Sequence, residues 1–108
     1  MNHYYTDNKN LPSNKSEFDY YFDNEVFCFT TDNGVFSKGG VDYGSYILIK
    51  TIYKKNLGNS FLDLGSGYGP IGIIIKRFNP NVDVEMVEVN SRAVELSILN
   101  NQKNKTNI

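Results

Sequence analysis

Hydrophobic and polar positions alternate along residues 18–30, where aromatic and β-branched side chains recur at every second place. This spacing is typical of strands whose two faces meet different surroundings. The pair Asp23-Asn24 divides the stretch, as in a hairpin with a two-residue turn. A further turn predicts a third short strand at Val35 and Phe36, so we expect a small antiparallel region.

From residue 42 onward the pattern predicts helices and short apolar strands in alternation. The expected elements are a helix over 43–55, a strand over 61–64, a helix over 70–78, a strand over 82–89 and a helix ending near 101. Asp42 and Asn90 can cap the first and third helices, and Pro70 suits the first position of the second. Strands and helices in this order imply a parallel sheet with a right-handed crossover. We therefore predict an α/β fold in which an antiparallel hairpin region precedes a parallel sheet.

The polar start of the chain differs in character from the remainder. Residues 1–16 lack periodicity, so we interpret them as a flexible amino-terminal arm. The hairpin region then spans 17–41 and the parallel part 42–108, and together they form one domain. His3 has no neighbour of ligand type at metal spacing, and no metal site is predicted.

The composition limits the binding partners and the cellular compartment that we expect for this chain. The formal net charge is -1, so no overall basic field attracts nucleic acid, and an RNA contact would need a local patch. Cys28 is the single cysteine, which excludes an internal disulfide. No apolar run approaches the roughly 20 residues of a membrane span, and the start does not resemble a signal peptide. We expect a cytoplasmic protein without a membrane partner.

A glycine-rich turn, Asp63-Leu64-Gly65-Ser66-Gly67-Tyr68-Gly69-Pro70, joins the first predicted parallel strand to its helix. Glycines let the backbone turn tightly and let a ligand lie against it, and the amides of a helix start favour negative charge. Glu88 ends the next strand, 23 residues after Gly65. A carboxylate in that place can accept hydrogen bonds from both hydroxyls of a ribose.

The nature of the nucleotide follows from the register of this turn. Residues 67–72 match the dinucleotide pattern G-x-G-x-x-G, but the match begins two residues late after a strand that ends near Leu64. Asp63, before the first glycine, suits a ligand with a positive amine. S-adenosylmethionine (SAM) carries such an amine together with a ribose, so we favour SAM over a dinucleotide. A tight turn without a ligand, and a purely structural role for Asp63, remain the alternatives.

Three stretches together resemble the small-subunit ribosomal RNA guanine-N2 methyltransferases, a family of class I SAM-dependent enzymes. They are residues 34–45 (GVFSKGGVDYGS), residues 63–72 and residues 87–93. The resemblance covers nearly the whole chain and corresponds to the amino-terminal part of a Rossmann-like methyltransferase fold. It implies that Glu88 binds the cofactor ribose and that Asp63, Gly65, Ser66, Gly67, Tyr68 and Gly69 form the loop at the methionine end.

The same resemblance assigns a role to the segment before the first helix. Phe36 and Lys38 would fold over the cofactor, with Lys38 paired to the cofactor carboxylate or to RNA phosphate. A solvated loop lysine is the alternative. Two positions depart from the family: Ser66, where cysteine is frequent, and Glu88, where aspartate is commoner.

The resemblance also implies a catalytic Asn-Pro-Pro-aromatic motif after the fourth strand of the sheet, and no Asn-Pro-Pro occurs in these 108 residues. We assign no catalytic residue and expect the SAM-binding part of an enzyme whose complete form methylates guanine N2 in 16S ribosomal RNA. Methylation of a protein or small molecule, or a non-catalytic SAM-binding module, are the alternatives. The first parallel strand would keep an unpaired edge and the helix over 70–78 too little sheet for cover. We therefore expect self-association or completion by a missing carboxyl-terminal half.

Overall fold

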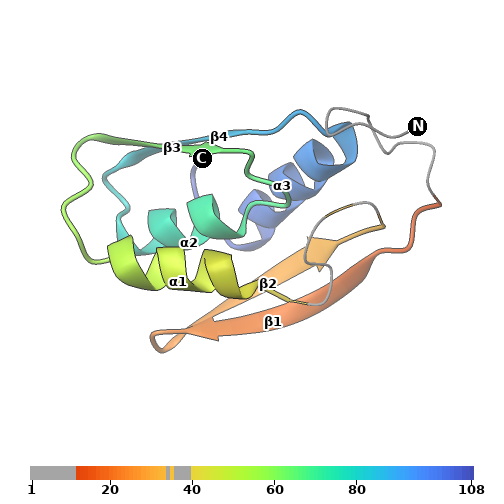
Figure 1. Cartoon of the computed structure of the whole chain (residues 1–108), viewed down its shortest axis with the longest axis horizontal. Helices are drawn as coiled ribbons and strands as arrows, with labels where there is room; N and C mark the ends of the chain where they lie inside the picture. The colour runs from red at the N-terminus through yellow and green to blue at the C-terminus, as the bar shows by residue number, and fades with distance from the viewer. Residues whose placement is uncertain (1–11, 34, 36–39) are drawn as a thin grey trace.

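Two small sheets enclose the helices of this chain, as the computed structural model shows for residues 12–33, 35 and 40–108 (Figure 1). In chain order the elements are β1 (Ser16–Phe22), β2 (Glu25–Thr31), α1 (Tyr43–Ile52), β3 (Ser60–Leu64), α2 (Pro70–Phe78), β4 (Asp83–Val87) and α3 (Ser91–Lys103). Within these described residues, no helix has the length and apolar character that crossing a bilayer requires. The order of elements confirms the predicted α/β fold.

The hairpin β1–β2 forms as its sequence predicts. Phe22 pairs with Glu25 across the turn, and Asp23 and Asn24 have φ values of 46° and 64°. Positive φ at both central residues is the geometry that lets a two-residue turn follow the twist of its strands. The predicted third strand is wrong at Val35, which lies in a bend because its amide donates to the Asp32 carbonyl at 3.2 Å. Phe36 lies outside the described residues.

The parallel part begins with capped helices. The Asp42 side chain accepts a hydrogen bond from the Ser45 amide, and the Asn90 side chain accepts one from the Ala93 amide. Pro70 is the first residue of α2. The three helix starts match the predicted ones, because each is determined by a residue at or next to that start. Strand β3 pairs in parallel with β4, and Leu64 lies opposite Val87.

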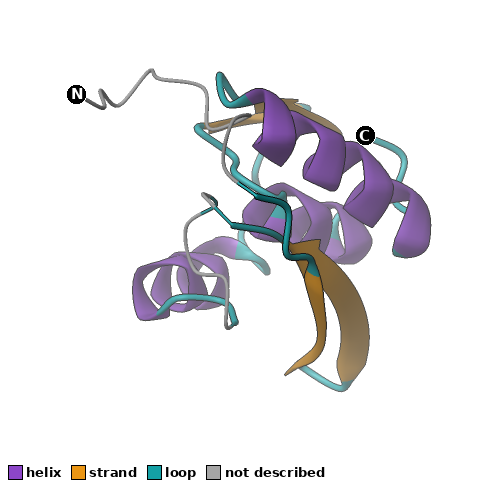
Figure 2. Cartoon of the chain, turned by 90° about the vertical axis from the view of Figure 1, so that its right-hand side faces the viewer, coloured by secondary structure: helices purple, strands orange, loops and turns teal. Residues whose placement is uncertain are grey.

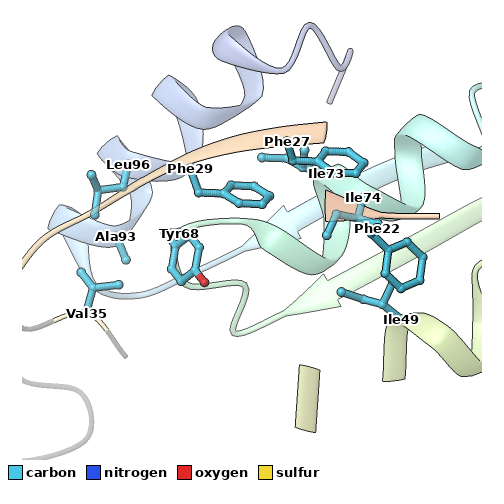
Figure 3. Packing of buried hydrophobic residues seen from close by; sticks show 10 residues of the cluster. All are labelled: Phe22, Phe27, Phe29, Val35, Ile49, Tyr68, Ile73, Ile74, Ala93 and Leu96. Atoms are coloured by element: carbon cyan, nitrogen blue, oxygen red, sulfur yellow. The ribbon is translucent and has the colours of Figure 1, made fainter. Parts of the chain in front are cut away.

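The core lies between the hairpin and α2. Figure 3 shows the aromatic rings of β1 and β2 over the isoleucines of α2, and Figure 2 shows α1 and α3 on either side of that helix. Ile73, Ile74 and Ile75 are all fully buried. The expectation that α2 would lack cover is therefore wrong, since the inner face of the hairpin covers the side that the parallel sheet does not. The fully buried members of this packing also include Phe27, Phe29 and Ile49.

Among the residues that the structure describes, none covers the outer face of the parallel sheet to a comparable extent. Within the described residues β3 is hydrogen-bonded to β4 alone, which confirms the expected unpaired edge. Leu62 and Leu64 are 57% and 76% exposed, and Val87 is exposed opposite Leu64 in the parallel register. These three residues form an outer apolar strip on one face of the sheet, with the exposed Glu85 opposite Leu62 at its border.

Candidate cofactor site

The glycine loop, residues 65–69, joins the carboxyl end of β3 to the start of α2 and folds over the end of β4. The amides of Gly65 and Ser66 both donate to the Val87 carbonyl, at 2.7 and 3.0 Å. The Gly69 amide turns back and donates to the Ser66 carbonyl at 3.0 Å. The loop is therefore fixed to the neighbouring strand by its main chain.

Two glycines of this region are required for different reasons. Gly67 has a φ of 60°, and an added Cβ would meet no atom within 4 Å, so the left-handed backbone alone favours glycine there. At Gly72 an added Cβ would lie 2.8 Å from the Met86 side chain, so close packing of α2 on β4 favours glycine. Only the first of these positions leaves its surface open to a ligand.

Glu88 follows β4 and joins the two halves of the candidate site. Its Oε1 accepts a hydrogen bond from the Gly67 amide at 2.8 Å. Its Oε2 accepts from the amides of Val89 and Asn90, both at 3.0 Å. A negative charge at the start of α3 is also favourable because the first amides of a helix carry partial positive charge.

Asp63 lies in β3 under the loop and is only 7% exposed. Its Oδ2 accepts a hydrogen bond from the Gly72 amide at 3.1 Å. Burial raises the pKa of this carboxyl; the Gly72 amide acts against the rise, and the charge of Glu88 adds to it. This geometry fits the structural role that the sequence left open, and contact with a cofactor amine stays a prediction.

The side chain of Tyr68 turns away from the loop surface into the core, where it is 3% exposed (Figure 3). Its ring meets Phe18 and Phe29 edge-on, at 6.2 and 5.7 Å between centroids, and its hydroxyl donates to the Gly40 carbonyl at 3.3 Å. Burial raises the pKa of the Tyr68 hydroxyl well above its ordinary value. A cofactor contact of this residue would therefore have to come from its main chain.

Ser66 presents the opposite case. Its Oγ is buried and has no hydrogen-bond partner among the residues that the structure describes. A buried hydroxyl without a partner is costly, and such a group next to an open backbone suits a ligand with polar atoms. The predictions for Phe36 and Lys38 lie outside the described residues.

A well-formed cavity lies away from this loop. A cavity of about 270 Å³ lies between Ser13, Lys15 and the first half of α3, and its lining contains none of residues 63–69. Asp32 forms part of its wall and accepts hydrogen bonds from the Ser13 hydroxyl and the Asn14 amide. The hydrogen bond between Ser13 and Asp32 therefore lies in the wall of this cavity.

One residue next to the loop was not predicted from the sequence. Asn100 of α3 is fully buried and donates to the Tyr68 carbonyl at 2.8 Å. Its helical spacing from the buried Ala93 and Leu96 indicates that it faces the core. A polar residue on the apolar face of a predicted helix was the sequence signal that could have identified Asn100 as a buried contact.

Residues 26–108 match the family model described as the methyltransferase small domain. The chain belongs to this family. It is 41% identical to protein YbxB of Bacillus subtilis (strain 168) over 102 residues. This alignment covers 94% of this chain and 51% of that protein. It is 35% identical over 82 residues to ribosomal RNA small subunit methyltransferase C of Aliivibrio fischeri (strain MJ11), covering 76% of this chain and 24% of the relative.

A solved structure is similar in fold. The T. thermophilus 16S rRNA N2 G1207 methyltransferase (RsmC), in complex with AdoMet and guanosine, matches with a TM-score of 0.78 and 27% identity. The match covers 90% of this chain and 27% of that protein. The chain thus corresponds to part of a Rossmann-like methyltransferase fold, as the resemblance implied, and spans about half or less of these relatives.

Proposed function

We propose that residues 17–108 form the SAM-binding part of a SAM-dependent methyltransferase that acts on ribosomal RNA. The observation that carries the proposal is the hydrogen bond between Gly67 and Glu88. It joins the two elements that we propose to bind the ligand, at the carboxyl ends of adjacent parallel strands. Ligands of open α/β sheets bind at this edge.

The residues present fit such a cofactor. The backbone at Gly67 is open, and the Ser66 hydroxyl is buried without a partner in the described structure. Each carboxylate oxygen has two lone pairs. Both on Oε2 are used by the amides of Val89 and Asn90 and one on Oε1 by the Gly67 amide, so Oε1 of Glu88 retains one acceptor site for a ribose hydroxyl. The cofactor supplies a methyl group on a positively charged sulfur. The loop and Glu88 would bind and orient it; the covering role that the family resemblance implies for Phe36 and Lys38 concerns residues outside the described ones.

For the substrate we propose guanine N2 in 16S ribosomal RNA. Similarity to the methyltransferase C proteins and to the T. thermophilus enzyme supports this choice. We assign no catalytic residue within these 108 residues, and the transfer itself is proposed for the complete protein. A methyltransferase acting on a protein or small molecule is the alternative that a substrate assay distinguishes.

A two-dimensional amide NMR titration with SAM tests cofactor binding. We expect shifts concentrated in residues 65–69 and at Glu88. NADH serves as the control ligand and should leave these signals unmoved. Shifts with NADH and none with SAM would replace the cofactor assignment by a dinucleotide, and shifts with neither would remove it.

A transfer assay with radiolabelled SAM and 16S ribosomal RNA tests whether this chain binds the cofactor without transferring its methyl group. We expect the 108-residue chain to transfer no methyl group, because no group that could orient a guanine amine has been assigned to it. Turnover by this chain would contradict that assignment and call for a catalytic residue among residues 1–108.

A further inference from the structure

Two asparagines four residues apart, Asn100 in α3 and Asn104 at its C-cap, hydrogen-bond along the edge of β2 where a neighbouring strand would otherwise pair. Asn100 accepts from the Thr30 amide at 2.8 Å and donates to the Thr30 carbonyl at 3.0 Å. Asn104 does the same at Cys28, at 3.0 and 2.9 Å. Residues two apart in a strand, such as Cys28 and Thr30, present their backbone amides and carbonyls at the same edge. Side chains four residues apart lie on the same face of a helix, so one asparagine can pair with each of these two residues.

The two asparagines differ in their third contact. The Asn100 Nδ2 also donates to the Tyr68 carbonyl, in the middle of the glycine loop, at 2.8 Å. The Asn104 Nδ2 instead donates to the Asn100 carbonyl within α3, also at 2.8 Å. Both side chains are buried. Of these two asparagines, Asn100 is therefore the one whose side chain hydrogen-bonds to both the hairpin and the loop.

The contact falls on a peptide group that shapes the loop. The peptide between Tyr68 and Gly69 is held at both ends, because Asn100 binds its carbonyl and the Ser66 carbonyl accepts its Gly69 amide. With both ends held, the plane of this peptide is fixed. Its orientation sets the direction of the backbone between Gly67 and the first turn of α2.

We propose that Asn100 is a positioning residue for the glycine loop, which holds the Tyr68–Gly69 peptide in the orientation that binds the cofactor. The inference rests on the proposed function for its effect on SAM. Its effect on the loop does not depend on any ligand. Asn104 provides the matched control, since it anchors the same strand from the same helix without touching the loop.

The test compares Asn100→Ala with Asn104→Ala in the 108-residue chain, at a temperature where both are folded. Both variants should melt earlier than the wild type. For Asn100→Ala the SAM dissociation constant should rise about tenfold, as expected for a lost hydrogen bond. For Asn104→Ala it should change less than about twofold. Equal weakening by the two variants, or none by Asn100→Ala, would overturn the proposal.

The ligand-free NMR spectrum separates this proposal from the proposed function. Amide signals of Gly67, Tyr68 and Gly69 should shift in Asn100→Ala and stay in place in Asn104→Ala. If the wild type does not bind SAM, the cofactor assignment fails while this comparison still decides the role of Asn100. Unchanged loop signals in Asn100→Ala would overturn the positioning role.

A wild-type measurement covers the case in which Asn100→Ala does not fold. A scalar coupling across the hydrogen bond between the Asn100 side-chain nitrogen and the Tyr68 carbonyl carbon should be detectable. Slow hydrogen exchange of the same side-chain amide should accompany it. Fast exchange without a coupling would show that the loop is not held by Asn100.

Discussion

One oxygen of the Glu88 carboxylate accepts a hydrogen bond from the Gly67 amide at 2.8 Å, and the other accepts from the amides of Val89 and Asn90. Every group that faces this carboxylate in these contacts is a donor. The residue proposed to bind the ribose is thus also the residue that fixes the glycine loop to the start of α3. Loop geometry and ribose binding should therefore respond together to changes at this position.

The first prediction concerns Glu88→Gln. A side-chain amide has one acceptor and one donor end, so in either orientation its NH₂ faces an amide hydrogen that Glu88 now accepts. We expect the free energy of unfolding to fall by about 1–3 kcal/mol, as for the loss of a hydrogen bond to a charged group. Chemical denaturation measures this change.

Glu88→Asp is the control for that prediction. It keeps two acceptor oxygens but shortens the reach, and aspartate is common in the resembled family. It should bind SAM more tightly than Glu88→Gln. Equal stability of the wild type and Glu88→Gln would contradict the geometry described for the carboxylate.

The second prediction follows from the buried Asp63. Burial raises the pKa of this carboxyl above its ordinary value of 3.8 in spite of the Gly72 amide. The folded state then holds its proton more strongly than the unfolded chain does. The stability from this group is complete below pH 3.8 and is lost as the pH rises through the folded-state pKa.

Asp63→Asn tests that sign, because asparagine cannot ionise and its Oδ1 can still accept the Gly72 amide. The stability of the variant relative to the wild type should increase from pH 4 toward neutral pH. Urea denaturation of both proteins across this range gives the difference. A difference that is constant or decreases with pH would show that Asp63 ionises at least as readily in the folded protein as in the unfolded chain.

The third prediction separates the two parts of Tyr68. Since its ring packs on Phe18 and Phe29, Tyr68→Ala should lower the free energy of unfolding by about 3–5 kcal/mol. Tyr68→Phe loses only the long hydroxyl contact to Gly40 and should cost about 1 kcal/mol or less. SAM affinity should be the same for Tyr68→Phe and the wild type, as titration calorimetry can show. Weaker binding by Tyr68→Phe would assign the hydroxyl a part in cofactor binding.

The sequence predicted those features that residues close in the chain decide. Asp42, Asn90 and Pro70 mark helix starts through contacts within one turn, and Asp23-Asn24 determines a local turn. The glycine loop was found from its residues because the motif is contiguous in the chain. Each of these signals is confined to a few neighbouring residues.

Features that depend on distant pairs could not be predicted in this way. Asn100 meets Tyr68 across 32 residues and Thr30 across 70, and no local pattern encodes either contact. The cover of α2 by the hairpin is of the same kind, since the two regions carry separate sequence patterns. The direction of the Tyr68 ring depends on this packing as well, and its spacing in the motif gave no sign of it.

The fourth prediction concerns the outer apolar strip. Leu62 and Leu64 alternate on the exposed face of β3, and Val87 lies beside Leu64 in the parallel register. Exposed leucine and valine side chains of this kind favour association although Glu85 lies opposite Leu62, and an unpaired strand edge next to them adds hydrogen-bonding groups. We expect the isolated chain to associate as its concentration rises, which analytical ultracentrifugation measures.

The variant Leu64→Lys tests whether the chains associate through the outer apolar strip. Leu64 is 76% exposed, so the change should alter the free energy of unfolding by no more than about 0.5 kcal/mol while a charge opposes contact at the strip. Tyr21→Lys is the matched control because Tyr21 is 75% exposed on the hairpin, outside the strip. Association that persists in Leu64→Lys and weakens in Tyr21→Lys would place the contact on the hairpin. A wild-type chain that stays monomeric at all concentrations would show that two parallel strands with an open face are tolerated in solution.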